Sequence, residues 1–270
     1  MELTPQQRAD YERDGFLLFP ELFSAAEIAM LKVELQRLCQ FQGEEVVRER
    51  TGTARMVFRT HDADSPTASS AFHALARLPR ILGPAQQVLG DDELYIHHTK
   101  CNVKEAIDGT AYQWHQDYGR WMYDGIPQAN MTTMMIMLEG ATEMGGCLYF
   151  LPRSHKLGRA EPEWDDKTSS YGTWVVPKER ILAAMAECPE PVAVTGPPGS
   201  AVLFHCNLMH GSGHNLSKHS RWHAYTAFNT VANHARTVED PRPVWVRGTD
   251  FTPLRMVADD AILDGAQAAE

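Results

Sequence analysis

The segment Ala111–Trp121, which reads AYQWHQDYGRW, places His115 and Asp117 two positions apart among aromatic residues. It follows strand-like sequence, and on a strand residues i and i+2 point to the same face. The imidazole and the carboxylate could therefore reach one point in space and bind a metal ion there. The alternative is that the pair lies on the surface and has no chemical role.

A metal site would need a third ligand, and His210 is the best candidate. It ends the apolar run AVLFHCNLMH and is followed by Gly-Ser-Gly. Two histidines and one carboxylate form the facial triad of non-haem Fe(II) oxygenases, which leaves three coordination positions open. His205 is the main rival, but it lies inside the apolar run and is better explained as a residue that packs or bonds locally.

Arg221 follows His210 by eleven residues and starts another strand-like run. A guanidinium can hold a carboxylate through two parallel hydrogen bonds, although a salt bridge at a strand end would also explain this arginine. A 2-oxo acid could chelate Fe(II) through two open positions, O2 could take the third, and Arg221 could bind the far carboxylate. Together these residues predict a centre that uses Fe(II), 2-oxoglutarate and O2.

The composition restricts the class of protein. The chain has 270 residues, a net charge of −10 and five cysteines without a CxxC spacing. The acidity argues against nucleic-acid binding, which needs a basic face. The cysteines favour reduced thiols, and neither a secretory signal nor a membrane-spanning run is visible. We expect a cytoplasmic enzyme with a small-molecule substrate and no membrane partner, either a monomer or a homodimer.

Helical signals come first along the chain, and strand signals follow. The segments TPQQ and SAAE are capping boxes that predict two helix starts, and a third helical stretch covers about 69–89, with interruptions near Pro79 and Gly83-Pro84. Strand-like runs begin at Glu93, and this order is typical of a β-sandwich or barrel with a helical layer. The polar segment Arg159–Glu187 fits no strand pattern and resembles a lid or binding loop.

Three motifs together resemble the phytanoyl-CoA dioxygenase superfamily of Fe(II)/2-oxoglutarate oxygenases. They are WHQDYGRW, the PRSHKLG turn at 152–158, and HGSGHNLSKHSR at 210–221. Within this superfamily the chain is most similar to the bacterial hydroxylases of small amino acids, the ectoine, proline 4-hydroxylase and leucine 5-hydroxylase group. The resemblance implies a mainly β, α+β fold: a double-stranded β-helix (jelly-roll, cupin-like) core over 91–255, with helices packed on one side and a mainly helical layer over 1–90. One domain would then span 1–270.

The resemblance also implies roles for the residues that match the family's motifs. His115, Asp117 and His210 match the iron ligands, while Arg221 and Ser212 match the residues that hold the tail of 2-oxoglutarate. Related halogenases have a small residue at the aspartate position, which admits chloride. The aspartate in this chain therefore implies hydroxylation.

Further residues are expected to contact the co-substrate or the substrate. Asn102 matches an asparagine that contacts the co-substrate, and Tyr112 and Trp121 match aromatics that line the pocket around the metal motif. His98 stands where relatives often have glutamine, and we expect it, rather than its histidine neighbour, to face the pocket. Tyr118 is expected to help place the substrate, with a role in the core as the alternative.

We therefore expect an enzyme that hydroxylates an unactivated C–H bond of a small free amino acid or amino-acid-like metabolite, releasing succinate and CO2. One alternative keeps this chemistry on a small phosphonate, an acyl-CoA or a secondary-metabolite scaffold, including desaturation or cyclisation. A phosphonate or CoA substrate would require extra cations near the pocket. Arg120 could hold a substrate carboxylate, or it could be a solvated arginine. The other alternative is a non-catalytic metal-binding module, which the intact triad and Arg221 argue against.

Overall fold

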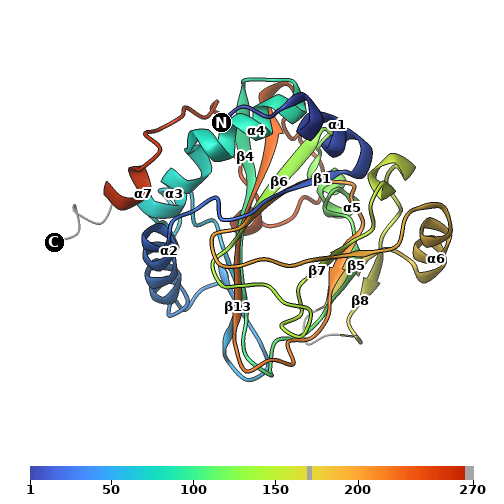
Figure 1. Cartoon of the computed structure of the whole chain (residues 1–270), viewed down its shortest axis with the longest axis horizontal. Coiled ribbons are helices and arrows are strands. Elements are labelled where there is room, and N and C mark those ends of the chain that lie inside the picture. Colours follow the sequence, from blue (N-terminus) through green and yellow to red (C-terminus); the bar gives the residue numbers. More distant parts are fainter. Residues whose placement is uncertain (169–171, 265–270) are drawn as a thin grey trace.

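Two antiparallel sheets form the centre of the protein, and Figure 1 shows them in a computed structural model that describes residues 1–168 and 172–264. In spatial order, the larger sheet consists of β1 (Phe16–Phe19), β11 (Ala201–His205), β6 (Met131–Met137), β13 (Arg221–Thr230), β4 (Leu94–Lys104), β3 (Ala54–Phe58) and β2 (Val46–Arg48). The smaller sheet consists of β10 (Val192–Val194), β7 (Leu148–Phe150), β12 (His210–Ser212) and β5 (Tyr112–His115).

Helices cover the outer face of the larger sheet (Figure 1). They are α1 (Pro5–Asp14), α2 (Ala25–Leu38), α3 (Ser70–Arg77), α4 (Pro79–Leu89) and the short α7 (Ala261–Asp264). Both expected capping boxes are present, at Thr4 and Ser24. The helical stretch breaks at Leu78, before Pro79, whereas Pro84 lies inside α4. None of the helices in the described ranges is long and apolar enough to cross a membrane.

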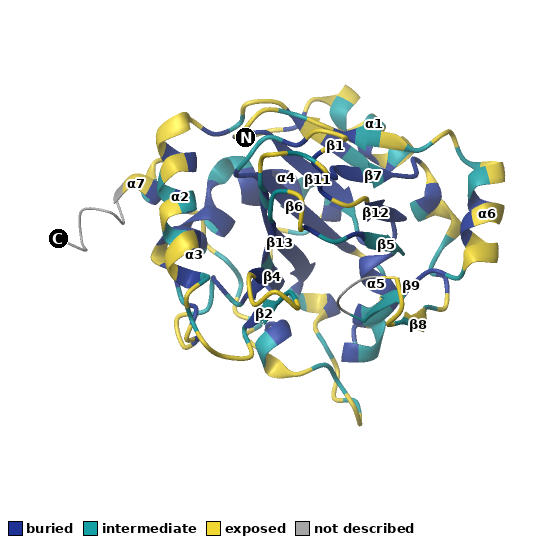
Figure 2. Cartoon of the chain, turned by 90° about the horizontal axis from the view of Figure 1, so that it is seen from below, coloured by how far each residue is buried: buried dark blue, intermediate teal, exposed yellow. Residues whose placement is uncertain are grey.

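The central strands of the larger sheet are buried on both faces, as the dark strands of Figure 2 show. In β6, Met134 and Ile136 pack in the core beneath the helices, whereas Met135 and Met137 pack between the two sheets. All seven residues of β6 are buried. A strand between two apolar layers has no polar face, which explains why this run shows no polar alternation.

Two regions contain strands that the sequence did not reveal. The N-terminal region adds β2 and β3 to the larger sheet, and the segment 159–187 contains β8 (Glu163–Asp165), β9 (Thr173–Val175) and the helix α6 (Lys178–Glu187). The expectation that this segment lacks strands is therefore wrong. Its strands are only three residues long and pair through Trp164 and Trp174, whose ring centroids lie 5.5 Å apart. A cross-strand side-chain pair stabilises such short strands. They are too short to show an alternating pattern in the sequence.

Short helical elements complete the connections. They are α5 (Asp117–Trp121) and four 3-10 turns, η1 (Met122–Asp124), η2 (Ser154–Leu157), η3 (Val231–Asn233) and η4 (Val244–Val246).

Candidate active site

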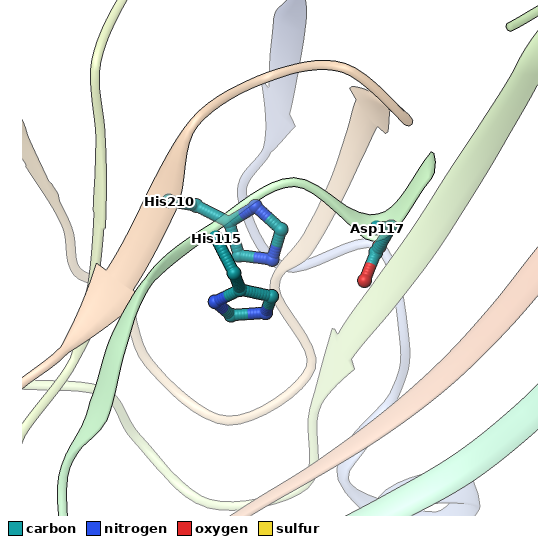
Figure 3. Close-up of side chains that lie close together, drawn as sticks. All are labelled: His115, Asp117 and His210. Carbon is teal, nitrogen blue, oxygen red and sulfur yellow. The ribbon is translucent and has the colours of Figure 1, made fainter. Parts of the chain in front are cut away.

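The smaller sheet and the helix that follows β5 bring His115, Asp117 and His210 together. His115 ends β5 and His210 begins β12, and the two residues are paired directly in the smaller sheet. Their ring centroids lie 4.1 Å apart. One ligand atom from each histidine and from Asp117 lies within 4.8 Å of the other two (Figure 3). Neighbouring strands thus place residues that are distant in sequence at one point.

Asp117 reaches this point from a helix, which differs from the expectation that it shares a strand with His115. The chain leaves β5 after His115, and Asp117 is the first residue of α5. Successive helix residues are rotated by about 100°. Arg120 and Trp121 therefore return to the side of Asp117 and line the same cavity. Tyr118 turns away and donates a hydrogen bond to the Ile126 carbonyl over 3.1 Å, so its position gives no support to a substrate contact.

Both imidazoles are oriented for metal binding. His115 Nδ1 donates to the Gln113 carbonyl over 2.7 Å, and His210 Nδ1 donates to the Leu208 carbonyl over 2.9 Å. These hydrogen bonds leave each Nε2 lone pair available to a metal. Burial, reinforced by His210, lowers the pKa of His115 to about 3, and burial also lowers the pKa of His210. The two rings are thus neutral at physiological pH, the state that binds metals.

The third ligand is an ionised carboxylate. Burial alone would raise the pKa of Asp117, but the positive charge of Lys100 opposes this effect, and the pKa lies below its ordinary value. Two neutral imidazoles and one carboxylate are the donor set of non-haem Fe(II) centres. The residues present therefore fit iron.

The arginine expected to bind 2-oxoglutarate lies in the same interior with unused donors. Arg221 is 1% exposed, and its Nη1 donates to His223 Nδ1 over 3.0 Å. Its Nε and Nη2 have no hydrogen-bond partner among the described residues, and neither does the buried Oδ1 of Asn102. Burying unpaired donors is costly unless a ligand satisfies them. A carboxylate of 2-oxoglutarate would satisfy those of Arg221.

Two neighbours of Arg221 were missed in the sequence. Because His223 Nδ1 accepts from Arg221, its Nε2 carries a proton, and that donor is also unpartnered in the described part of the chain. Lys104, 2% exposed and paired with Arg221 across β4 and β13, donates to Ser212 Oγ over 2.9 Å. The Ser212 hydroxyl accepts this bond and keeps its own proton for an anion. The Tyr112 ring lies beside this group, with Lys104 Nζ 5.5 Å from its centroid.

The protonation state of Lys104 gives a pH prediction. Burial, together with the charges of Arg221 and Arg55, lowers the pKa of Lys104 to about 5. The unfolded chain keeps the ordinary lysine pKa, about 10.4, so it binds more protons between these values. The free energy of unfolding therefore rises with pH between about 5 and 10 because of this group. As the pH falls toward 5, the buried neutral lysine makes the folded state progressively less stable relative to the unfolded chain. Lys104→Met should flatten the pH dependence of the urea midpoint between pH 6 and 9, and parallel curves would contradict this.

A cavity of about 400 Å³ is lined by His115 and Asp117 and by the expected substrate residues Trp121 and His98. His97 is an extra residue in β4, because Ala227 pairs with His98 and Phe228 pairs with Ile96. This bulge lets both imidazoles pack against Trp121, at 5.1 and 5.9 Å, although we expected only one to turn inward. Of the two, only His98 lines the cavity.

A C-terminal segment forms one wall of the cavity and was not anticipated. His98 Nδ1 donates to the Val246 carbonyl over 2.6 Å. Arg242 donates to Asp124 Oδ2 from Nη2 over 2.6 Å and from Nε over 2.8 Å. Trp245 from this segment lines the cavity and packs edge-on against Phe58 of β3. These contacts connect residues more than a hundred positions apart, and no local pattern signals them.

The 159–187 segment forms another part of the cavity wall and is hydrogen-bonded to the metal motif at two points. Gln116, between the two ligands His115 and Asp117, donates to the Gly158 carbonyl and accepts from the Ala160 amide, both over 2.8 Å. The Val176 amide donates to the Trp114 carbonyl over 2.8 Å. Trp164 and Trp174 of this segment line the cavity. The expected lid or binding loop thus lies against the site, apart from residues 169–171, which are outside the described ranges.

Comparisons with known proteins identify what the chain resembles. The family model for phytanoyl-CoA dioxygenase (PhyH) matches residues 11–222. An ectoine dioxygenase of Streptomyces anulatus is 33% identical over 259 residues, covering 91% of this chain and 85% of that protein. An ectoine dioxygenase of Sphingopyxis alaskensis is 34% identical over 258 residues, covering 89% and 81%.

Solved structures of iron- and 2-oxoglutarate-binding enzymes are similar to this chain as well. The structure of EctD from S. alaskensis with 2-oxoglutarate and 5-hydroxyectoine superposes with a TM-score of 0.80 at 31% identity, covering 95% of this chain and 88% of that one. The epimerase SnoN with Fe3+ and alpha ketoglutarate superposes with a TM-score of 0.67 at 23% identity, covering 94% and 93%, and shares the fold.

Proposed function

We propose a function from the premise that the chain belongs to the phytanoyl-CoA dioxygenase family and is an Fe(II)/2-oxoglutarate-dependent dioxygenase that uses iron, 2-oxoglutarate and O2. It hydroxylates an unactivated C–H bond of a small free amino acid or amino-acid-like metabolite and releases succinate and CO2. The observation that carries this proposal is the largely buried cluster of two histidines and one carboxylate, together with the donors of Arg221 that have no partner among the described residues.

We assign separate roles to the residues that would bind iron and 2-oxoglutarate. His115, Asp117 and His210 hold iron, which, when bound with 2-oxoglutarate and O2, supplies the oxidation of the C–H bond. Arg221 binds the far carboxylate of 2-oxoglutarate. Lys104 orients the Ser212 hydroxyl toward the same group.

Other residues shape the two binding pockets. Asn102 and Tyr112 border the 2-oxoglutarate pocket, while Trp121 and His98 form part of the substrate wall. Phe58, Trp121, Trp174 and Trp245 line the cavity, and their rings would limit the water that reaches a bound substrate.

Ectoine is the first substrate to test, because the curated relatives at 31–34% identity are ectoine dioxygenases. His98 stands where the family often has glutamine, so the preferred substrate can differ from ectoine while remaining a small amino-acid derivative. Tyr118 stays a candidate only through its packing beside Trp121.

Succinate release tests this function. Anaerobically Fe(II)-loaded protein receives 2-oxoglutarate and O2 together with ectoine, L-proline, L-leucine or 2-aminoethylphosphonate. We expect one amino-acid-like compound to stimulate succinate release and to gain one oxygen atom in equal amount. A product that loses two hydrogens instead would indicate desaturation or cyclisation. Stimulation by the phosphonate alone would identify a small phosphonate, rather than an amino acid, as the substrate class.

We also infer a cytoplasmic enzyme that acts as a monomer or homodimer and does not bind nucleic acid. The net charge of −10 disfavours polyanions, and all five cysteines are free thiols. Light scattering after size exclusion would give the oligomeric state directly.

A further inference from the structure

Arg120 is a cation at the cavity whose hydrogen-bonding groups are unused. It is the fourth residue of α5 and lines the same cavity as Asp117 and Trp121. Its guanidinium lies 4.9 Å from the ring centroid of Trp174 and 5.2 Å from that of Tyr123. Within residues 1–168 and 172–264 it forms no salt bridge and donates no hydrogen bond.

Two other arginines near this wall show the contrast. Arg242 donates two hydrogen bonds to Asp124, over 2.6 and 2.8 Å, and Arg159 donates to Glu161 over 2.7 Å. Each of these guanidiniums is satisfied by an acidic group of the protein. The guanidinium carbon of Arg120 lies over the Trp174 and Tyr123 rings, and such a cation–π contact uses the positive charge without using the N–H donors. These ring contacts restrict the side chain and leave its N–H donors available to a planar or tetrahedral oxyanion.

The charges of the site favour such an anion. Iron(II), Asp117, the two carboxylates of 2-oxoglutarate and Arg221 neutralise one another. Lys100 and Arg120 also line the cavity and leave its substrate side positively charged. Unmatched charge is costly where burial lowers the dielectric, so a negatively charged substrate is the complementary one.

We propose that Arg120 binds an oxyanion group of the substrate, a carboxylate or a phosphonate, while Trp164 and Trp174 contact the apolar part. The inference rests on the proposed function and specifies its substrate. Residues i and i+3 of a helix are neighbours with Cβ atoms about 5–6 Å apart, so Arg120 and Asp117 face the same cavity. The helical start at Asp117 is what turns Arg120 toward the cavity.

The test compares acids with their uncharged analogues on the anaerobic Fe(II)–2-oxoglutarate complex. Ectoine, L-proline and L-leucine are each paired with the carboxamide, and 2-aminoethylphosphonate is paired with its dimethyl ester. We expect at least one acid to bind the wild-type complex about tenfold or more tightly than its partner, equivalent to about 1.4 kcal/mol. Arg120→Gln should reduce this preference to about twofold or less, and Arg120→Lys should restore part of it because the charge remains. If the preference appears in a carboxylate pair, the bound group is a carboxylate. If it appears in the phosphonate pair, the bound group is a phosphonate.

Arg180→Gln, which removes an exposed arginine of α6, is the control and should keep the full preference. Equal binding of acid and analogue by the wild-type complex, no binding of any acid, or an unchanged preference in Arg120→Gln would overturn this inference. Iron and 2-oxoglutarate binding is measured first in every variant. If the wild type binds neither, the proposed function itself fails, which is a different result.

Discussion

Asp117→Ala is expected to reduce iron-dependent succinate release by more than about 100-fold. Loss of an outer partner of a metal ligand already costs about 10–100-fold, and Asp117 supplies both a ligand atom and the negative charge of the cluster. The carboxylate is ionised despite its burial, because the positive charge of Lys100 helps to keep its pKa below the ordinary value. Turnover at saturating Fe(II) and 2-oxoglutarate measures the effect, and activity near the wild-type level would contradict the ligand assignment.

The histidines provide a matched control for that prediction. His210→Ala should abolish turnover as completely as Asp117→Ala, whereas His205→Ala should retain most of it. His205 lies five positions earlier but packs against His155, with ring centroids 5.2 Å apart, and accepts from the Asn207 amide over 3.0 Å. Equal losses in the two histidine variants would mean that general destabilisation, rather than iron binding, explains the result.

Arg221→Met is expected to raise the KM for 2-oxoglutarate by about 100-fold or more. Removing one partner of a buried charged hydrogen-bonded pair costs about 2–5 kcal/mol, and each 1.4 kcal/mol is a factor of ten. Iron affinity in the absence of 2-oxoglutarate should be unchanged, because the metal is held by other residues. Arg221→Lys should recover only part of the loss, since an ammonium lacks the two-pronged geometry of the guanidinium.

Stability distinguishes this role from a structural one. Arg221 is buried with two nitrogens unpartnered among the described residues, an arrangement that costs free energy in the absence of an anion. Arg221→Met should therefore leave the melting temperature of the ligand-free protein equal or higher, while abolishing the stabilisation that added 2-oxoglutarate gives the wild type. A large fall in the melting temperature without ligand would identify a structural arginine instead.

Much of the fold could be predicted because its signals are local. The capping boxes at Thr4 and Ser24 start helices where expected, and the prediction of a jelly-roll-type α+β fold is confirmed by the two antiparallel sheets and by the similarity to the EctD structure. The family resemblance is confirmed as well. Strands β2 and β3 were missed because they are short and lie among helical signals.

The site was only partly predictable, for two different reasons. One signal was present in the sequence but was not used: in HTKCNVK, His98, Lys100, Asn102 and Lys104 alternate with apolar or small residues, which marks one polar face of β4. The other contributions have no local signal. Trp174 and Trp245 reach the cavity through tertiary contacts, and the helical turn at Asp117 directs Arg120 toward the cavity and Tyr118 into the core.

Anaerobic titration with Fe(II) and then 2-oxoglutarate tests the central claim most directly. The account predicts one iron per chain and a visible absorption band that appears only when 2-oxoglutarate joins the iron. Asp117→Ala should lose both, whereas Arg221→Met should bind iron but require far more 2-oxoglutarate to form the band. Failure of the wild type to bind iron better than Asp117→Ala would contradict the assignment of His115, Asp117 and His210 as the metal centre.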